Sequence, residues 1–258
     1  MGEVGSYPNG TFCWVDLGTT DVSGARGFYG SLLGWQFDET GEGEYTICRL
    51  DGREVAGIHA HSEEEGTGWS SAISVDDLDA TLTRAEVLGQ TLAVDPLEVP
   101  GTARMAVIGD PVGAEVTLWQ PKGFIGARLV NEVGTWHWNE LVTRDLDGAA
   151  AFYGGVFGWS ADRVAAAIPR LSFGLDRLLI GGVHGPAPGE EDVPRWTVSF
   201  RVADADQALA TMEQMGGRVM LPPMDVPAGR FSVVSDPAGA SFTVTATARD
   251  PFRGVDGS

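Results

Sequence analysis

The segment Thr135–Trp159 reads TWHWNELVTRDLDGAAAFYGGVFGW, and the segment Thr11–Trp35 reads TFCWVDLGTTDVSGARGFYGSLLGW. The two segments begin 124 residues apart, and from Gly10 and Gly134 onward they align without a gap and agree at 13 of 26 positions. A repeat of this length indicates that a whole structural unit has been duplicated. The chain is therefore expected to form two related units of about 125 residues, each long enough to bury a core.

Matching signals extend well beyond these two segments. An Asp-Pro dipeptide opens a turn at 110–111 and again at 236–237, and the strands GIHA (57–60) and GVHG (182–185) also correspond. We predict a first domain at residues 10–121 and a second at 133–247, joined by a linker at 122–132. Residues 1–9 are expected to form a flexible N-terminal arm and residues 248–258 a tail.

Each unit shows the pattern of two βαβββ modules. Strand and helix periodicities, with turns at Gly, Pro and Asp, predict the following elements. In the first unit they are strands at 12–19, 45–50, 55–59, 69–75, 103–109 and 114–119, with helices at 22–33 and 77–88. In the second unit they are strands at 136–143 and 196–202, hairpins within 171–184 and 231–244, and helices at 147–157 and 204–215. Strands interspersed with few helices indicate an α+β fold.

The composition excludes several classes of function. With 17 Lys+Arg against 36 Asp+Glu, the net charge is −19, so neither nucleic acid nor an anionic membrane surface is an expected partner. No apolar run approaches the roughly 18 residues that span a bilayer. Two cysteines and an N-terminus without a secretory pattern favour a cytoplasmic protein. The glycines form neither a P-loop nor a dinucleotide-binding turn, so no nucleotide cofactor is expected.

The order of these elements resembles a known superfamily. A strand, a Phe-Tyr helix ending in Leu-Gly-Trp (33–35) or Phe-Gly-Trp (157–159), and a closing Asp-Pro-x-Gly hairpin resemble the vicinal oxygen chelate superfamily, which includes glyoxalases, bleomycin-resistance proteins and extradiol dioxygenases. Together with the Trp-x-Glu-Leu opening at 138–141, they look like the actinobacterial tandem members often labelled hydroxylases or glyoxalase-like proteins. The resemblance implies paired βαβββ modules that form two half-open barrels, arranged like a fused dimer. Whether each barrel forms within one half or by exchange of modules stays open.

The resemblance also implies where a metal ion would bind. Metal-dependent members hold a divalent ion with a His, Gln or Glu on the first strand, a His on the fifth and a Glu on the eighth. Aligned to this chain, the three positions of each half are Trp14, Ser70 and Thr117, and Trp138, Thr197 and Thr243. Indole offers no lone pair, and a hydroxyl is a poor substitute for imidazole or carboxylate. We therefore expect no metal and no other cofactor in either cavity.

Carboxylates lie two residues after each of these tryptophans. Side chains alternate along a strand, so Asp16 should share a face with Trp14, and Glu140 with Trp138. In an apolar aromatic cavity their pKa would rise, and either could serve as a catalytic base or anchor a ligand. His59 and His184, which end equivalent strands, are the candidate catalytic partners. The alternatives are an acid paired with an Arg and a histidine bonded to a loop carbonyl.

Tryptophan on the predicted barrel strands indicates the kind of ligand. Indole rings with a few polar groups suit a flat aromatic molecule. The candidate ligand-binding residues are therefore Trp14, Trp138, Trp69, Trp196 and Trp119, with the hydroxyls of Ser70, Thr197, Thr117 and Thr243. Core packing is the alternative, and we expect it for Trp35 and Trp159 at the helix ends.

Two classes of function remain open. The first is a metal-free binding protein for an aromatic or hydrophobic metabolite or drug. The second is a metal-free tailoring enzyme of the hydroxylase, isomerase or lyase type, and a metal-dependent glyoxalase or dioxygenase ranks below both. The expected partner is a small molecule, and the chain is expected to be a monomer built as a fused pseudo-dimer, or a homodimer. One or both cavities could be active, and Glu140 makes the second half the first place to look.

Overall fold

The structure is a computed structural model that describes residues 2–38, 45–186, 192–226 and 229–247. The predicted tail at 248–258 lies outside these residues. The first half contains β1 (Phe12–Thr19), α1 (Val22–Leu33), β2 (Gln36–Phe37), β3 (Tyr45–Leu50), β4 (Arg53–Ala60), β5 (Gly68–Ser74), α2 (Leu78–Val87), β6 (Thr91–Val99), β7 (Ala103–Gly109) and β8 (Glu115–Pro121). The second half contains β9 (Trp136–Val142), α3 (Leu146–Phe157), β10 (Ser160–Arg163), β11 (Arg170–Leu175), β12 (Leu178–His184), β13 (Arg195–Arg201), α4 (Ala205–Gln214), β14 (Arg218–Val226), β15 (Gly229–Ser235) and β16 (Ser241–Ala246).

The strands form two eight-stranded mixed sheets, one from each half of the chain. Their orders are β2-β3-β4-β1-β5-β8-β7-β6 and β10-β11-β12-β9-β13-β16-β15-β14. In each sheet the two modules meet at one antiparallel pair, β1 with β5 or β9 with β13. The α+β tandem fold of paired modules is thus confirmed, and each pair of modules lies within one half. Neither sheet closes on itself within the described residues, so both are open sheets rather than closed barrels.

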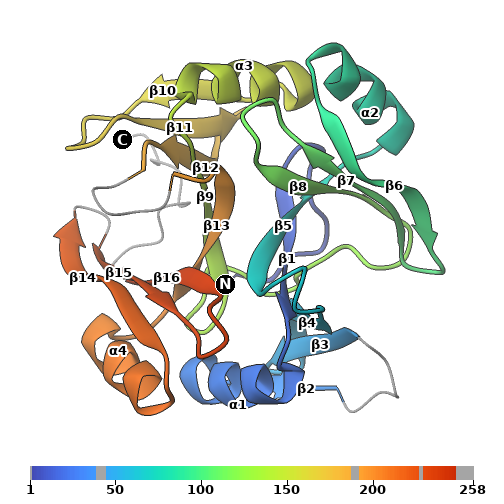
Figure 1. The fold of residues 1–258 in the computed structure, drawn as a ribbon. Helices are drawn as coiled ribbons and strands as arrows, with labels where there is room; N and C mark the ends of the chain where they lie inside the picture. The colour runs from blue at the N-terminus through green and yellow to red at the C-terminus, as the bar shows by residue number, and fades with distance from the viewer. Residues whose placement is uncertain (1, 39–44, 187–191, 227–228, 248–258) are drawn as a thin grey trace, which may run out of the picture.

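The helices lie where the two halves meet. Figure 1 shows α2 beside α3 at one end of the molecule and α1 beside α4 at the other, and both pairs are in contact. The two sheets stand between these helix pairs and touch through β5 and β13. Each sheet therefore has an inner face, toward the helices and the other half, and an outer face that points away. No helix of the described residues is long and apolar enough to cross a membrane.

The repeated segment builds the start and the end of α1 and α3. Asp21 and Asp145 are the N-caps, and their side chains accept the backbone N–H of Gly24 and Gly148. Each helix then ends at a left-handed glycine, where a residue without Cβ carries no steric penalty. These are Gly34, with φ of 77°, and Gly158, with φ of 79°. The spacing between cap and glycine explains why the sequence predicted these helices within one residue of their bounds.

The same segment also binds the two halves together. Trp35 Nε1 donates to the Gly134 carbonyl and Trp159 Nε1 donates to the Gly10 carbonyl, each over 2.7 Å. Both indole rings are buried, as the sequence predicted for the helix ends. Each tryptophan thus bonds to the glycine that opens the repeat in the other half.

A second reciprocal contact runs through two buried tyrosines. Tyr29 donates to Asp236 over 3.1 Å, and Tyr153 donates to Asp110 over 2.8 Å. Both aspartates open the Asp-Pro turns of the opposite half. Burial raises the pKa of both carboxyls, and the hydrogen bonds that they accept from tyrosine and backbone N–H groups lower it in part.

Four strands and one contact were not predicted. The strands β2, β6, β10 and β14 are the outermost strands of the two sheets.

The contact involves the expected N-terminal arm, which lies against the linker. Val4 N donates to the Arg128 carbonyl over 3.0 Å, and the Tyr7 hydroxyl donates to the Ala127 carbonyl over 2.7 Å.

Candidate functional site

The strand register places most of the candidate residues on the outer faces. In the first sheet Trp14 pairs with Ala72 and Asp16 with Ser70, and Ala72 pairs in turn with Thr117. Because residues directly opposite each other share a face, Trp14, Asp16, Ser70 and Thr117 lie together. The predicted shared face of Trp14 and Asp16 is confirmed.

In the second sheet the equivalent set lies together as well. Trp138 pairs with Ser199 and Glu140 with Thr197, and Ser199 pairs with Thr243. A Cβ built on Gly182 would meet Glu140 Oε1 at 3.0 Å and the Trp138 ring at 3.6 Å, so both side chains pass over this glycine. The two halves thus present equivalent outer-face sites.

Hydrogen bonds within the chain satisfy the polar groups of the first-half site. Trp14 is 2% exposed, and its Nε1 donates to the Tyr45 hydroxyl over 2.7 Å. That hydroxyl donates to Asp16 Oδ2 over 3.1 Å, and the Ser70 hydroxyl donates to Asp16 Oδ1. Although the Tyr45 side chain is 43% exposed, its hydroxyl lies over Gly57, and desolvation and the charge of Asp16 raise its pKa.

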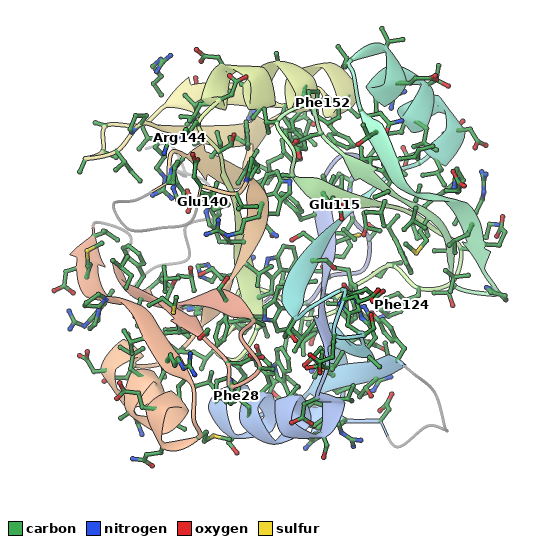
Figure 2. All side chains as sticks on the ribbon, in the orientation of Figure 1. Phe28, Glu115, Phe124, Glu140, Arg144 and Phe152 are labelled. Atoms are coloured by element: carbon green, nitrogen blue, oxygen red, sulfur yellow. The ribbon has the colours of Figure 1, made fainter. Side chains whose placement is uncertain are left out.

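An aromatic side chain from the linker covers Trp14. The Phe124 ring lies edge-to-face against Trp14, with centroids 4.9 Å apart, and against Trp119, with centroids 6.0 Å apart. Figure 2 shows Phe124 on the outer side of the first sheet and Glu140 on the outer side of the second. The first-half site is therefore occupied by the chain's own phenyl ring.

His59 belongs to a pair of histidines at the end of β4. Its Nε2 lies 3.1 Å from His61 Nε2, while His61 Nδ1 lies 3.1 Å from the Gly66 carbonyl. His61 Nδ1 must donate to that carbonyl, so in the neutral pair His59 Nε2 donates to His61 Nε2. The His59 ring also stacks on Tyr45 at a centroid distance of 5.7 Å. His59 thus lies beside Tyr45, the residue whose hydroxyl donates to Asp16.

In the second half a guanidinium replaces the tyrosine hydroxyl. Arg170 Nη2 lies 2.5 Å from Glu140 Oε1, and the Glu140 side chain is 16% exposed. This is the acid–Arg pair that the sequence left open as the alternative to a free carboxylate. Trp138 beside it is half-buried, in contrast to the buried Trp14.

The remaining second-half candidates surround this pair. His184 is the cross-strand neighbour of Arg170, and its Nδ1 donates to the Gly185 carbonyl over 2.7 Å, which is the alternative considered for a strand-end histidine. The Thr197 hydroxyl donates to the Glu140 backbone carbonyl over 3.0 Å. Thr243 is half-buried in the next strand.

Trp69 and Trp196 lie on the inner faces instead. Trp69 pairs with Leu17 and donates its Nε1 to the Tyr29 hydroxyl, while Trp196 pairs with Leu141 and donates to the Tyr153 hydroxyl. Trp69 is half-buried and Trp196 is buried. These two candidates are therefore not brought together with Trp14 and Trp138, and they support the buried tyrosine–aspartate contacts.

The residues that the resemblance aligns with the superfamily's three metal positions do not form a set of metal ligands. The outer faces offer two indoles and four hydroxyls there, none of which matches the imidazole and carboxylate donors that divalent ions require. Among the described residues no three His, Cys, Asp or Glu side chains come close enough together to hold an ion. The donor set at these positions does not fit the metal.

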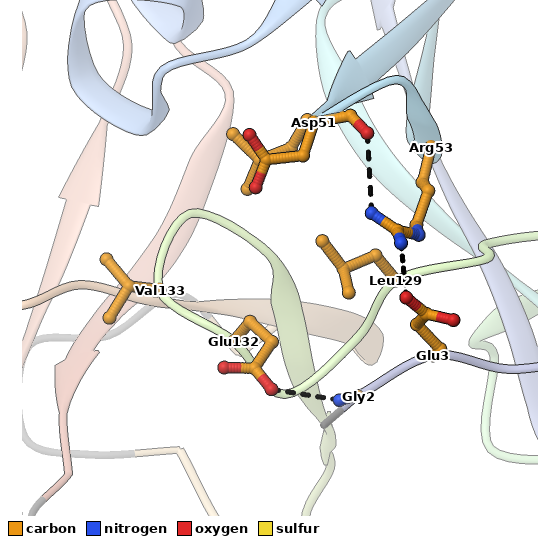
Figure 3. A pocket seen from close by; sticks show the side chains of 8 residues that line it. Gly2, Glu3, Asp51, Arg53, Leu129, Glu132 and Val133 are labelled. Atoms are coloured by element: carbon orange, nitrogen blue, oxygen red, sulfur yellow. Dashed lines mark hydrogen bonds and ion pairs between the residues drawn. The ribbon is translucent and has the colours of Figure 1, made fainter.

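A surface pocket lies at a different place. It has a volume of about 390 Å³ and is formed by the N-terminal residues, the β3–β4 turn and the linker. Figure 3 shows Glu132 accepting the Gly2 N–H and Glu3 paired with Arg53 across it. None of the candidate residues lines this pocket, so we assign it no part in the site.

Three residues of the outer faces were missed by the sequence reading. Tyr45 and Arg170 are equivalent by register, because each pairs across the sheet with the strand-end histidine of its half. Phe124 lies in a segment read only as a linker. Cross-strand register could not be obtained from one sequence, but the apolar pair Phe124-Ile125 between Gly123 and Gly126 was an available signal for a packed loop.

Comparisons with known proteins show the family to which the chain belongs. Residues 138–245 match the glyoxalase-like domain family. The chain is 40% identical to "Putative glyoxylase CFP32" of Mycobacterium tuberculosis over 257 residues, covering 95% of this chain and 97% of that protein. It is 31% identical to the anthracycline biosynthesis protein DnrV of Streptomyces peucetius, covering 92% and 94% of the two chains.

A solved structure shows the same fold. The Mn(II)-bound glyoxalase of Novosphingobium aromaticivorans superposes with a TM-score of 0.66 at 14% identity, covering 95% of this chain and 86% of that one. Identity this low supports the fold alone. With full-length relatives and a shared fold, this chain belongs to the glyoxalase-like proteins of the vicinal oxygen chelate superfamily.

Proposed function

We propose that this protein binds a flat aromatic small molecule on the outer face of its second half, and that it does so without the superfamily's metal ion. The observation that carries the proposal is Trp138, a half-buried indole on the outer face of the second sheet, which the resemblance aligns with the first metal ligand of metal-dependent members. An indole at that position offers a stacking surface in place of a metal bond.

The contrast between the halves supports the second half as the binding site. In the first half the Asp16 carboxylate accepts hydrogen bonds from the neutral hydroxyls of Tyr45 and Ser70. In the second half Glu140 and Arg170 form a charged pair next to Trp138. An aromatic surface with a few polar groups is typical of sites for small organic ligands.

The relatives indicate which ligand to test. One is named for anthracycline biosynthesis, and anthracyclines carry a flat, fused aromatic system. Wild-type protein titrated with an anthracycline and with plain anthraquinone should bind one molecule per chain, measured by tryptophan fluorescence and calorimetry. Trp138→Ala should weaken binding at least about tenfold, the equivalent of about 1.4 kcal/mol.

The control is Leu179→Ala, which removes an exposed apolar side chain of β12 in the same half. It should bind as the wild type does. Equal affinity of Trp138→Ala and wild type would contradict the proposal. A stoichiometric transition metal in the purified protein would contradict its metal-free part.

The second candidate is a metal-free tailoring enzyme that uses Glu140 as a base. It is favoured by the position of Glu140 on the same face as Trp138. Glu140→Gln keeps the shape of the side chain and removes its charge, so it should abolish turnover while ligand affinity changes only a few-fold. Loss of affinity in Glu140→Gln, with no turnover by the wild type, would leave the binding function alone.

A further inference from the structure

The Phe124 ring packs against two indoles of the first sheet. It meets Trp14 at an interplanar angle of 86° and Trp119 at 81°. Edge-to-face contacts at these centroid distances are the arrangement that two aromatic rings prefer. The phenyl ring is thus held between two indoles that both belong to the first sheet, while Phe124 itself comes from the linker.

The loop that carries Phe124 is fixed by its main chain and does not depend on the ring. Phe124 N donates to the Thr102 carbonyl over 3.2 Å, and the Phe124 carbonyl accepts Trp119 Nε1 over 2.9 Å. Ala127 N donates to the Cys13 carbonyl over 2.9 Å. Removal of the phenyl ring should therefore leave the loop anchored and open a space between the indoles.

The two halves differ in the indoles that they carry at equivalent strand positions. The offset that relates Thr117 to Thr243 relates Trp119 to Thr245, so the second half carries one indole at these positions and the first half two. Trp14 is 2% exposed beneath Phe124, whereas Trp138 is half-buried. Among the described residues, the two outer faces therefore differ in their aromatic side chains.

We propose that the first half contains a second aromatic-binding site, formed by Trp14 and Trp119, and that the chain's own Phe124 fills it. The site takes a single, uncharged six-membered aromatic ring. A ring bound in this site would pack edge-to-face against the two indoles. The backbone of the linker, which is held by hydrogen bonds, limits the size of the site.

The test is to remove the phenyl ring and supply one in solution. Phe124→Ala should leave an apolar cavity, and such cavities bind benzene-sized molecules. In ¹⁹F NMR, fluorobenzene should give a saturable bound signal of one molecule per chain. The wild type should lack this signal or bind at least about tenfold more weakly. Ile125→Ala, which shortens the neighbouring side chain of the same loop, is the matched control and should behave as the wild type.

Measurement in a Trp138→Ala background separates this site from the proposed function. If the double variant Trp138→Ala/Phe124→Ala shows a bound fluorobenzene signal that Trp138→Ala alone lacks, the first-half site is supported. This holds even if the second half binds no aromatic ligand at all. A folded Phe124→Ala protein that binds fluorobenzene no better than wild type overturns the proposal. If the alanine variant does not fold, Phe124→Val takes its place. If neither folds alone, fluorobenzene added during refolding should restore the folded state, and failure to do so also overturns it.

Discussion

At the scale of single residues, the duplication kept a tryptophan and a carboxylate in each half and changed their partners. Tyr45 and Arg170 occupy equivalent places beside His59 and His184. A tyrosine hydroxyl donates one hydrogen bond to Asp16, whereas the Arg170 guanidinium also supplies a positive charge to Glu140. A hydrogen bond from a charged donor such as guanidinium is shorter and stronger than one from a neutral donor. Two copies of one site have therefore acquired different electrostatics.

His59 should make the stability of the protein depend on pH. Burial lowers its pKa below the usual 6.5, His61 lowers it further, and Asp16 and Glu65 act in the opposite direction. The folded state then binds fewer protons than the unfolded state, so this contribution to stability is complete above about pH 6.5 and is lost as the pH falls toward the lowered pKa. Urea titrations at about pH 7.5 and pH 5.5 give the unfolding free energy at each pH. Between these two pH values, His59→Gln should lose less unfolding free energy than wild type.

The control for this prediction is His184→Gln, the equivalent substitution in the second half. It removes a histidine whose Nδ1 is bonded to the Gly185 carbonyl, and it leaves the His59–His61 pair intact. It should keep the acid sensitivity that His59 confers. If His59→Gln and wild type lost the same amount of unfolding free energy between the two pH values, His59 would be ruled out as the cause.

Strand alternation is the part of the site that one sequence predicts well. It placed Asp16 with Trp14 and Glu140 with Trp138 correctly, because each pair lies two residues apart on one strand. The same rule separates Trp69 from Ser70, and the structure has Trp69 on the inner face. The partners Tyr45, Arg170 and Phe124 could not be predicted, because they depend on which strands are neighbours and in what register.

At the scale of elements, the strands that the sequence missed share a physical property. They are the edge strands, so β6 and β14 pair on one side only and most of their side chains are exposed. Both β6 and β14 also contain proline and irregularities in their strand pairing. The prolines are Pro96 in β6 and the pair Pro222-Pro223 in β14. Proline is tolerated at an edge, where one side of the strand needs no partner. The central strands alternate or are buried throughout, and these were predicted.

Gly126 should be essential for docking of the linker. Its φ of 107° is unfavourable for other residues, and a Cβ there would lie 2.1 Å from the Cys13 carbonyl oxygen. Gly52 is the matched control, because its φ is 75° but nothing lies within 4 Å of its Cβ position. Gly52→Ala should cost about 1–2 kcal/mol of unfolding free energy for the left-handed backbone alone. Gly126→Ala should cost about 1–3 kcal/mol more because of the steric overlap.

Urea denaturation of the two glycine variants measures this difference directly. The Gly126→Ala variant should also show increased exposure of Trp14, seen as a red shift of its fluorescence, because the same loop carries Phe124 onto that ring. A cost for Gly126→Ala no larger than that for Gly52→Ala would mean that the linker can move aside without loss.

At the scale of the whole molecule, the repeated segment holds the halves together. The indole of Trp35 bonds to Gly134 and that of Trp159 bonds to Gly10, while Tyr29 and Tyr153 bond to the turn aspartates of the opposite half. Rings from both halves meet between the sheets, as in the contact of Trp35 with Phe200 at a centroid distance of 5.5 Å. Buried side chains of both halves belong to one core cluster, so the two halves form one packed unit in space.

We therefore expect the two halves to unfold together. Tyr29→Phe leaves the Asp236 carboxylate and the Trp69 N–H without their buried partner, which should cost about 1–3 kcal/mol of unfolding free energy. Calorimetry should show a single transition at a lower temperature, and native-state hydrogen exchange should show equal loss of protection in both sheets. Tyr7→Phe is the control, since its hydroxyl joins only the N-terminal segment to the linker. It should cost about 0.5–1.5 kcal/mol, the value of one ordinary hydrogen bond. Two separate transitions, or loss of protection in one sheet only, would show that the halves are independent despite the contacts between them.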